Sequence, residues 1–188
     1  MSVKRLIIGV SGASGAPLAL RLLEELKNVP EVETHLCITK GGEMTIEEEC
    51  NMSVNQFCAK ADAVYDINNI GASIASGTYK TMGMIVCPCS MKTVAGIAHG
   101  YSDNLLLRAA DVVIKEQRKL VLVTRESPLS KIHLDNMAYL SGLNNVFILP
   151  PVISYYSHPK SLEEIEKQIV GRILDRFDIE AGLKRWER

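Results

Sequence analysis

Short apolar runs of strand length recur along the chain, and they are apolar throughout instead of alternating with polar residues. They span residues 5–10, 35–39, 84–87, 120–124 and 146–149, and segments of helical length separate them. Strands that are apolar on both faces are typical of a parallel sheet that is covered by helices on both sides. The sequence therefore predicts a three-layer α/β fold with a doubly wound parallel sheet, of the flavodoxin or Rossmann type.

The length of the chain indicates how many domains it forms, and its charge indicates which partners it can bind. Its 188 residues suit a single domain, 1–188, in which residues 178–188 are expected to form a surface tail. The 21 Lys and Arg residues are balanced by 22 Asp and Glu residues, which disfavours binding to nucleic acid or to an anionic membrane. No stretch approaches the roughly 20 apolar residues that a membrane span needs. We therefore expect a cytoplasmic protein.

The cysteines do not form a metal-binding pattern. There are five, an odd number, at positions 37, 50, 58, 87 and 89. A structural zinc site would show a second closely spaced pair, which this arrangement lacks. We expect reduced thiols and no metal.

Ligands of doubly wound sheets bind at the carboxyl ends of the strands, so the residues after each run are of interest. These segments are 11–15, 39–42, 88–93, 125–130 and 150–158. Residues 11–15, Ser-Gly-Ala-Ser-Gly, precede a helix predicted over 16–27, where backbone N–H groups could approach a phosphate. Residues 87–93, Cys-Pro-Cys-Ser-Met-Lys-Thr, also open a helix. Two such turns indicate a phosphorylated ligand, although helix capping by Ser14 and Ser90 explains the same residues.

Spacing alone does not decide the roles of several polar side chains. Arg108, Asp111 and Lys115 form a stripe on a helix predicted over 105–116, which is typical of solvated ion pairs. Arg172 borders the apolar side of the last helix, from which it could reach solvent or a neighbouring site. The tyrosine pair at 155–156 could pack in the core or line a pocket.

Three blocks of sequence together resemble one family. They are KRLIIGVSGASGA at the start, CPCSMKTVAGIAHGYSDNLLLRAADVVIKEQRKLVLVTRESPLSKIHLDNM in the middle, and PPVISYYSHP before a last helix that contains GRILDRF. Over essentially the whole chain they resemble the UbiX-like flavin prenyltransferases. The resemblance implies a metal-independent transferase that joins dimethylallyl phosphate to N5 and C6 of reduced FMN and releases phosphate. It also implies a homododecamer whose product, prenylated FMN, serves a partner UbiD-type decarboxylase of aromatic acids.

The resemblance also implies roles for individual residues. The positions that would bind FMN are Gly12, Ala13, Ser14, Thr39, Ser90, Met91, Lys92, Thr93 and Arg125. Tyr156 and Arg172 would hold the phosphate of dimethylallyl phosphate, and the catalytic polar groups would be Glu49, Arg108, Lys115 and Glu126. Arg and Lys suit a dianionic leaving group, so Arg108 and Lys115 become phosphate ligands by resemblance. Whether Glu49 or Glu126 transfers protons stays open.

Two other functions also stay open. A flavin-dependent cysteine decarboxylase of the same fold would carry an active-site His after an early helix, a P-A-S-A-N-T turn and a P-x-M-N motif. Here the turn at 88–93 reads Pro-Cys-Ser-Met-Lys-Thr, and the other two features are missing. A flavin-binding accessory subunit of a hydroxyarylic acid decarboxylase would need no transferase chemistry. Residues 66–81 vary within the family, so the pocket wall that they form is not predicted.

Overall fold

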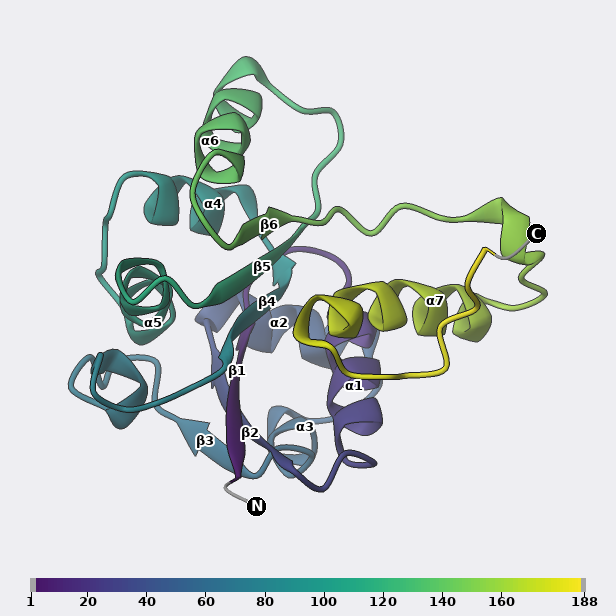
Figure 1. Ribbon diagram of the computed structural model, residues 1–188, viewed down its shortest axis with the longest axis horizontal. Helices are drawn as coiled ribbons and strands as arrows, with labels where there is room; N and C mark the ends of the chain where they lie inside the picture. The colour runs from purple at the N-terminus through teal and green to yellow at the C-terminus, as the bar shows by residue number, and fades with distance from the viewer. Residues whose placement is uncertain (1–2, 187–188) are drawn as a thin grey trace.

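The computed structural model describes residues 3–186, and its centre is one sheet of six parallel strands in the order β3-β2-β1-β4-β5-β6 (Figure 1). The strands are β1 (Lys4–Val10), β2 (Val32–Ile38), β3 (Ala63–Tyr65), β4 (Gly83–Cys89), β5 (Lys119–Thr124) and β6 (Val146–Ile148). All neighbouring strands pair in parallel. This topology confirms the predicted doubly wound sheet.

Helices cover both faces of the sheet (Figure 1). One face carries α1 (Ala16–Leu26), α2 (Lys40–Glu49), α3 (Val54–Cys58) and α7 (Leu162–Leu174). The other carries α4 (Met91–Ala98), α5 (Leu105–Lys115) and α6 (Lys131–Ser141). Three short 3-10 turns are η1 (Ser73–Ala75), η2 (Tyr155–Ser157) and η3 (Asp175–Phe177). None of the described helices is long and apolar enough to cross a membrane.

The two-sided burial of the strands explains why their sequences are apolar throughout. In β1, Leu6 and Ile8 pack in the core on the α1 side, whereas Ile7 between them packs in the core on the α5 side. All three side chains are buried. The sequence missed β3, because this edge strand has only three residues and its Val64 is exposed.

Two segments outside the sheet bear on the site. Residues 149–154 form an extended arm that leads from β6 to η2, away from the body of the molecule (Figure 1). After η3 the chain runs back along α7, where Lys184 N donates to Gln168 Oε1 at 3.3 Å and Gln168 Nε2 donates to Lys184 O at 3.0 Å. This segment is the predicted tail, of which residues 187 and 188 lie outside the described part.

Candidate functional site

A pocket of about 570 Å³ lies at the carboxyl edge of the sheet. It is next to the boundary between β1 and β4, neighbouring strands that are followed by helices on opposite faces. Such a switch point is where doubly wound sheets bind ligands. The predicted residues in its lining are Gly12, Thr39, Ser90, Met91, Lys92, Thr93 and Glu126. The lining also contains Lys40, Gly41, Ile67, Asn68, Asp103, Asn104 and Leu107.

Hydrogen bonds join the two loops that leave β1 and β4. The buried Ser11 Oγ accepts from Ser90 N at 2.8 Å and donates to Pro88 O at 3.0 Å. Ser90 caps α4, because its Oγ accepts from Thr93 N at 3.4 Å, and it also lies 3.1 Å from Thr93 Oγ1. The capping interpretation of Ser90 is therefore confirmed, and these hydrogen bonds hold the loop beside the pocket.

The amino end of α1 is already bonded to an anion of the protein itself. Glu49 Oε2 accepts from Gly15 N at 2.8 Å and from Ala16 N at 2.9 Å. A carboxylate in this position is favoured by the partial positive charge of the helix end. The cap residue of α1 is Gly15, with no side-chain cap, so the alternative prediction of a Ser14 cap is wrong. In the predicted phosphate cradle at 11–15, Gly15 N is thus bonded to Glu49, as is the N–H of the next residue, Ala16.

Two facing glycines bring backbone close to backbone in the pocket wall. A Cβ on Gly12 would lie 2.9 Å from the Cα of Gly41, and a Cβ on Gly41 would lie 3.1 Å from the Cα of Gly12. Real side chains do not tolerate the shorter of these contacts, so glycine is required at this approach. Thr39, which follows β2, caps α2 by accepting from Gly42 N at 3.1 Å.

Two smaller pockets extend this site along the carboxyl edge. An apolar pocket of about 330 Å³ shares Met91 and Glu126 with the first pocket. It shares Pro150 with a pocket of about 180 Å³ that Arg172 lines. The shared residues place the three pockets in a series that leads from Thr39 to Arg172.

Tyr156 lies near the Arg172 end of this series. Its hydroxyl accepts from Gln168 Nε2 at 3.4 Å, and Gln168 lines the same small pocket as Arg172. The Tyr156 ring meets the ring of Trp186 edge-on, with 5.2 Å between centroids. The fold therefore brings Tyr156 and Arg172, 16 positions apart in the sequence, to one region of α7.

Two predicted phosphate ligands are not in the pocket of this chain. Arg108 Nη1 lies 2.8 Å from Asp111 Oδ2, and Lys115 pairs with Glu116. The predicted ion pairs on α5 are thus present, with Glu116 as the partner of Lys115. Because α5 returns from the carboxyl edge to the start of β5, Lys115 lies at its far end, about 10 Å along the helix from Arg108.

Three predicted FMN ligands follow β1 or β5 but do not line the 570 Å³ pocket, namely Ala13, Ser14 and Arg125. Arg125 is exposed, its backbone N donates to Cys89 O at 3.2 Å, and its guanidinium has no ion-pair partner within residues 3–186.

The cysteines are unsuited to nucleophilic chemistry. All five are free thiols. Burial raises the pKa of Cys37 and of Cys87 to about 12, and burial together with Glu49 and Glu166 raises the pKa of Cys50 to about 11. These thiols are therefore protonated at neutral pH. Within residues 3–186, no cluster of three or more His, Cys, Asp or Glu side chains could hold a metal ion.

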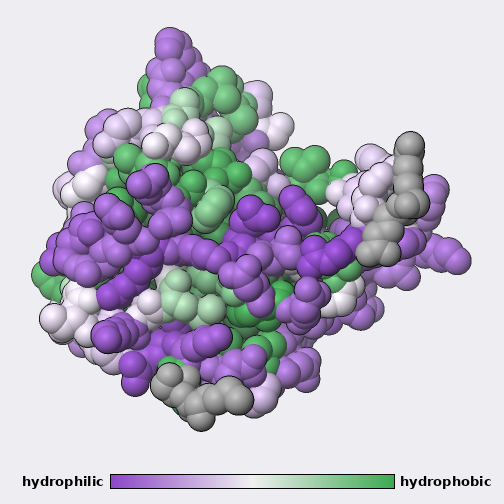
Figure 2. Space-filling view, in the orientation of Figure 1, coloured by the Kyte–Doolittle hydropathy of each residue, from purple (hydrophilic) through white to green (hydrophobic). Residues whose placement is uncertain are grey.

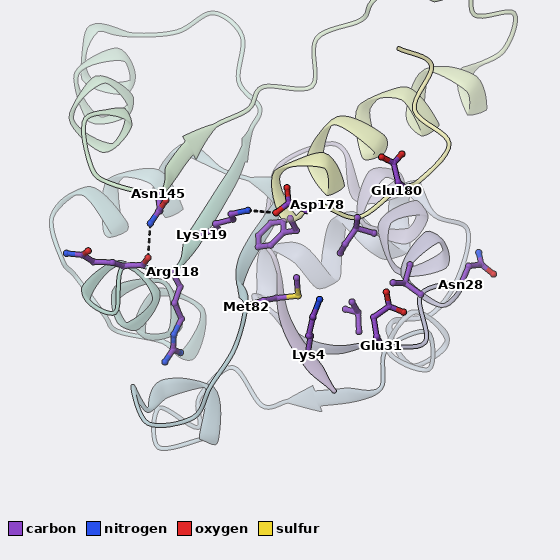
Figure 3. A pocket seen from close by; sticks show the side chains of 14 residues that line it. Lys4, Asn28, Glu31, Met82, Arg118, Lys119, Asn145, Asp178 and Glu180 are labelled. Atoms are coloured by element: carbon purple, nitrogen blue, oxygen red, sulfur yellow. Dashed lines mark hydrogen bonds and ion pairs between the residues drawn. The ribbon is translucent and has the colours of Figure 1, made fainter. Parts of the chain in front are cut away.

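A pocket of about 800 Å³ lies at the opposite, amino edge of the sheet (Figure 3). Its lining comes from the starts of β1 and β5 and from the chain after α7. Lys119 Nζ pairs with Asp178 Oδ2 at 2.9 Å, and Asn145 Nδ2 donates to Gln117 O at 2.8 Å (Figure 3). These polar groups bond to one another, and the strand ends that bind ligands in this fold lie at the other edge. The size of this pocket alone does not make it the functional site.

Comparison with known proteins shows to which family the chain belongs. Residues 1–174 match the Flavoprotein family. The flavin prenyltransferase LpdB of Lactiplantibacillus plantarum is 48% identical over 186 residues, which cover 98% of this chain and 99% of that protein. The chain belongs to the UbiX-like flavin prenyltransferase family. The resemblance seen in the sequence is thereby confirmed.

Solved structures of UbiX-like proteins confirm the fold. The dodecameric FMN-dependent UbiX-like decarboxylase of Escherichia coli O157:H7 superposes with a TM-score of 0.95 at 49% identity, covering 98% of this chain and all of that one. AnUbiX in complex with FMN and dimethylallyl pyrophosphate superposes with a TM-score of 0.96 at 43% identity, covering 99% and 98% of the two chains.

Seven lining residues of this UbiX-like chain escaped the sequence reasoning, namely Lys40, Gly41, Ile67, Asn68, Asp103, Asn104 and Leu107. Lys40 and Gly41 lie in the segment 39–42 that follows β2, but no motif distinguished them. Ile67 and Asn68 follow β3, and their strand end was not considered because β3 itself was not predicted. Ile67 and Asn68 form the part of the pocket wall that comes from the variable segment 66–81, for which the sequence made no prediction.

Proposed function

We propose that this UbiX-like protein is a flavin prenyltransferase, which joins the dimethylallyl group of dimethylallyl phosphate to N5 and C6 of reduced FMN and releases inorganic phosphate. The observation that supports this most is near-half identity, over the whole chain, to a curated flavin prenyltransferase. The complex of AnUbiX with FMN and dimethylallyl pyrophosphate supports FMN and a phosphorylated dimethylallyl compound as the two ligands.

The residues present fit a flavin with a phosphate group. The pocket of about 570 Å³ is within the range of small-ligand sites. It offers hydroxyl groups from Thr39, Ser90 and Thr93. Four cations of this edge form no ion pairs within residues 3–186, namely Lys40, Lys92, Arg125 and Arg172. Others, such as Lys131 with Asp135, are paired. Cations without carboxylate partners suit anionic ligands.

In the proposed reaction, bound FMN supplies the nucleophilic N5 and C6 positions. Arg172 and Tyr156 hold the phosphate of the second substrate and stabilise the charge that develops as it departs. Apolar side chains of the middle pocket, such as Met137 and Ile148, exclude water from the allyl group. Glu49 or Glu126 moves a proton to or from the phosphate or the flavin.

Assembly into a dodecamer, as in the Escherichia coli O157:H7 relative, is part of the proposal. Large apolar side chains are exposed on α6 and on the arm, where Figure 2 shows hydrophobic surface; they are Ile132, Leu134, Tyr139, Val152 and Ile153. Burying such side chains between subunits is favourable. In the assembly, Arg108 and Lys115 would reach the phosphate site of a neighbouring subunit.

The prenylated FMN would be passed to a UbiD-type (de)carboxylase in the cytoplasm. Anaerobic incubation of the protein with reduced FMN and dimethylallyl phosphate, followed by mass spectrometry of the extracted flavin, tests the proposal. We expect FMN that is heavier by one dimethylallyl unit, together with released phosphate. Bound but unmodified FMN would instead indicate an accessory flavoprotein. Carbon dioxide release from a hydroxyarylic acid or a cysteinyl peptide by this protein alone would indicate a decarboxylase.

A further inference from the structure

The segment 179–186, which we call the strap, runs back along α7 and ends beside η2 (Figure 1). Near its end, Arg185 Nη2 lies 2.9 Å from Asp175 Oδ1. Leu183 packs directly on the buried Gly171 of α7, where a Cβ would lie 3.1 Å from the Cβ of Leu183. A larger residue in place of Gly171 would therefore push the strap away from the helix.

Gln168 of α7 binds the backbone of the strap at a single residue. Its Nε2 donates to Lys184 O at 3.0 Å, and its Oε1 accepts from Lys184 N at 3.3 Å. A backbone N–H can only donate and a backbone carbonyl can only accept, so this pair of bonds fixes which way the amide of Gln168 is turned. The amide nitrogen therefore remains the donor toward any further partner.

That further partner is Tyr156, which follows the arm. Gln168 Nε2 donates to the hydroxyl of Tyr156 at 3.4 Å. The strap holds the same turn at two other points, because the Trp186 ring meets the Tyr156 ring edge-on at 5.2 Å between centroids and Lys184 Nζ donates to Ser157 O at 3.1 Å. Gln168 and the strap thus fix both the ring and the hydroxyl of Tyr156.

The direction of these hydrogen bonds has a chemical consequence. The hydroxyl of Tyr156 accepts from Gln168, so its own hydrogen points elsewhere and is left for a ligand. Gln168 lies one helical turn before Arg172, and both line the pocket of about 180 Å³. A phosphate bound to Arg172 needs donors, and a hydroxyl turned in this way supplies one.

We propose that Gln168 is a positioning residue for the phosphate of dimethylallyl phosphate, because it fastens the strap and turns the hydroxyl of Tyr156 into a donor toward that phosphate. The inference rests on the proposed function in that Tyr156 and Arg172 hold this phosphate. Gln168 itself makes no contact with the substrate, since Lys184 and Tyr156 occupy both polar atoms of its amide.

Calorimetric titration of dimethylallyl phosphate into protein that holds oxidised FMN tests the proposal without catalysis. Gln168→Met and Tyr156→Phe should each weaken binding about tenfold, because both remove the same directed hydrogen bond to an anion. Since Gln168 acts through Tyr156, the double variant should bind within about twofold of Tyr156→Phe alone. Lys167→Met is the matched control, because Lys167 is the neighbouring residue on α7 and pairs with Glu163, and it should match the parent.

The strap has its own reporter, because Trp186 is the single tryptophan of the chain. Gln168→Met should shift its emission and increase its quenching by acrylamide, whereas Lys167→Met should change neither. Gly171→Leu is an independent variant that displaces Leu183 without altering Gln168 or Tyr156. It should release Trp186 in the same way and also weaken the binding of dimethylallyl phosphate.

Kinetics separate positioning from chemistry. In prenylation assays, the KM of Gln168→Met for dimethylallyl phosphate should rise about tenfold, whereas kcat should fall by less than about threefold, because the hydroxyl itself remains. Unchanged affinity in Gln168→Met, or losses that add up in the double variant, would overturn the inference. A parent whose binding of dimethylallyl phosphate depends on Gln168 but which forms no prenylated FMN would refute the proposed function and leave the inference in place.

Discussion

At the scale of single residues, Glu49 combines a structural contact with a proposed chemical role. One carboxylate oxygen accepts from both Gly15 N and Ala16 N, so the side chain ties the end of α2 to the start of α1. Its neighbours in the loop after β1 form one wall of the pocket. A substitution that keeps the hydrogen-bonding oxygen can therefore separate the two roles.

We predict that Glu49→Gln folds like the parent, because an amide oxygen can still accept from both N–H groups, but that it loses prenyl transfer if Glu49 carries the proton. Glu49→Ala should in addition lower the free energy of unfolding by about 1 kcal/mol, since the end of α1 loses its acceptor. Urea denaturation and single-turnover prenylation measure the two effects. Full activity of Glu49→Gln would leave Glu126 as the proton carrier.

Arg172 provides a second prediction at this scale. If it pairs with the phosphate of dimethylallyl phosphate, Arg172→Ala should slow prenylation on the order of a hundredfold to a thousandfold, as does the loss of one donor to a developing anion. FMN affinity should stay close to that of the parent. Tyr156→Phe should show a smaller loss, because the ring remains.

Lys167→Ala is the matched control, since Lys167 lies on the same helix and pairs with Glu163 at 3.2 Å. Each variant must keep the oligomeric state of the parent, measured by light scattering. A parent-like rate for Arg172→Ala, with the same dependence on dimethylallyl phosphate, would make Arg172 a structural cation of α7.

At the scale of elements, the edge of the sheet at β2 and β3 supports the segment that walls the pocket. His35 is a buried residue of β2. Its Nδ1 lies 2.8 Å from Tyr65 Oη, and Tyr65 Oη lies 3.0 Å from Ser73 Oγ. Its Nε2 has no hydrogen-bond partner within the described residues and lies 3.7 Å from Glu33 Oε2. Ile67 and Asn68 follow directly after this edge and line the pocket.

This arrangement predicts a pH dependence of stability. Burial lowers the pKa of His35, and it outweighs the opposite effect of Glu33; Arg5 lowers this pKa further and Asp62 raises it. The unfolded chain therefore binds a proton at His35 at a higher pH than the folded chain does. Stability from this group is present above the ordinary histidine pKa of about 6.5 and decreases as the pH falls below it.

The free energy of unfolding, measured in urea at about pH 7.5 and about pH 5.5, should decrease less between the two values in His35→Gln than in the parent. His99→Gln is the control, because His99 is exposed. A pH effect in His35→Gln equal to that of the parent would contradict the prediction, whatever the absolute stability of the variant.

At the scale of the whole molecule, the exposed apolar side chains of α6 and the arm are the features that a lone subunit leaves unexplained. Leu134 is 50% exposed and Ile132 is 70% exposed on one helix. Exposure of such apolar surface to water is unfavourable in free energy. The proposed assembly would cover this surface, which lies on elements next to the middle pocket that Leu134 itself lines.

We predict that the parent elutes as a large oligomer, near twelve times the 20.7 kDa chain, and that Leu134→Lys shifts it to smaller species. A buried lysine without a partner would oppose subunit contact. Asp135→Lys is the control, because it introduces the same side chain at the next position. Asp135 is exposed and pairs with Lys131, so this variant should keep the oligomeric state of the parent. Light scattering measures both, and a parent that is monomeric at micromolar concentration would contradict the proposed dodecamer.

The sequence by itself determined the fold class and the edge of the sheet at which the candidate site lies. Strands that are covered on both faces are apolar along most of their length, so β1, β2, β4, β5 and β6 were visible as apolar runs without any structure. The loops after β1, β2, β4 and β5 were then named as site segments, and each contributes to the pocket lining. The small edge strand β3 was missed because an exposed strand of three residues has no such signature.

Only the tertiary structure decided which side chains meet. Glu49 occupies the amino end of α1 because the end of α2 lies beside it, a contact over 33 and 34 positions that no local pattern records. Gly12 approaches Gly41, and Ile67 and Asn68 join the wall, for the same reason. The local sequence pattern indicates whether a segment forms a helix or a strand and which of its faces is buried, because residues close in the sequence determine both. The composition of a pocket depends on how separate elements pack, and that requires the fold in three dimensions.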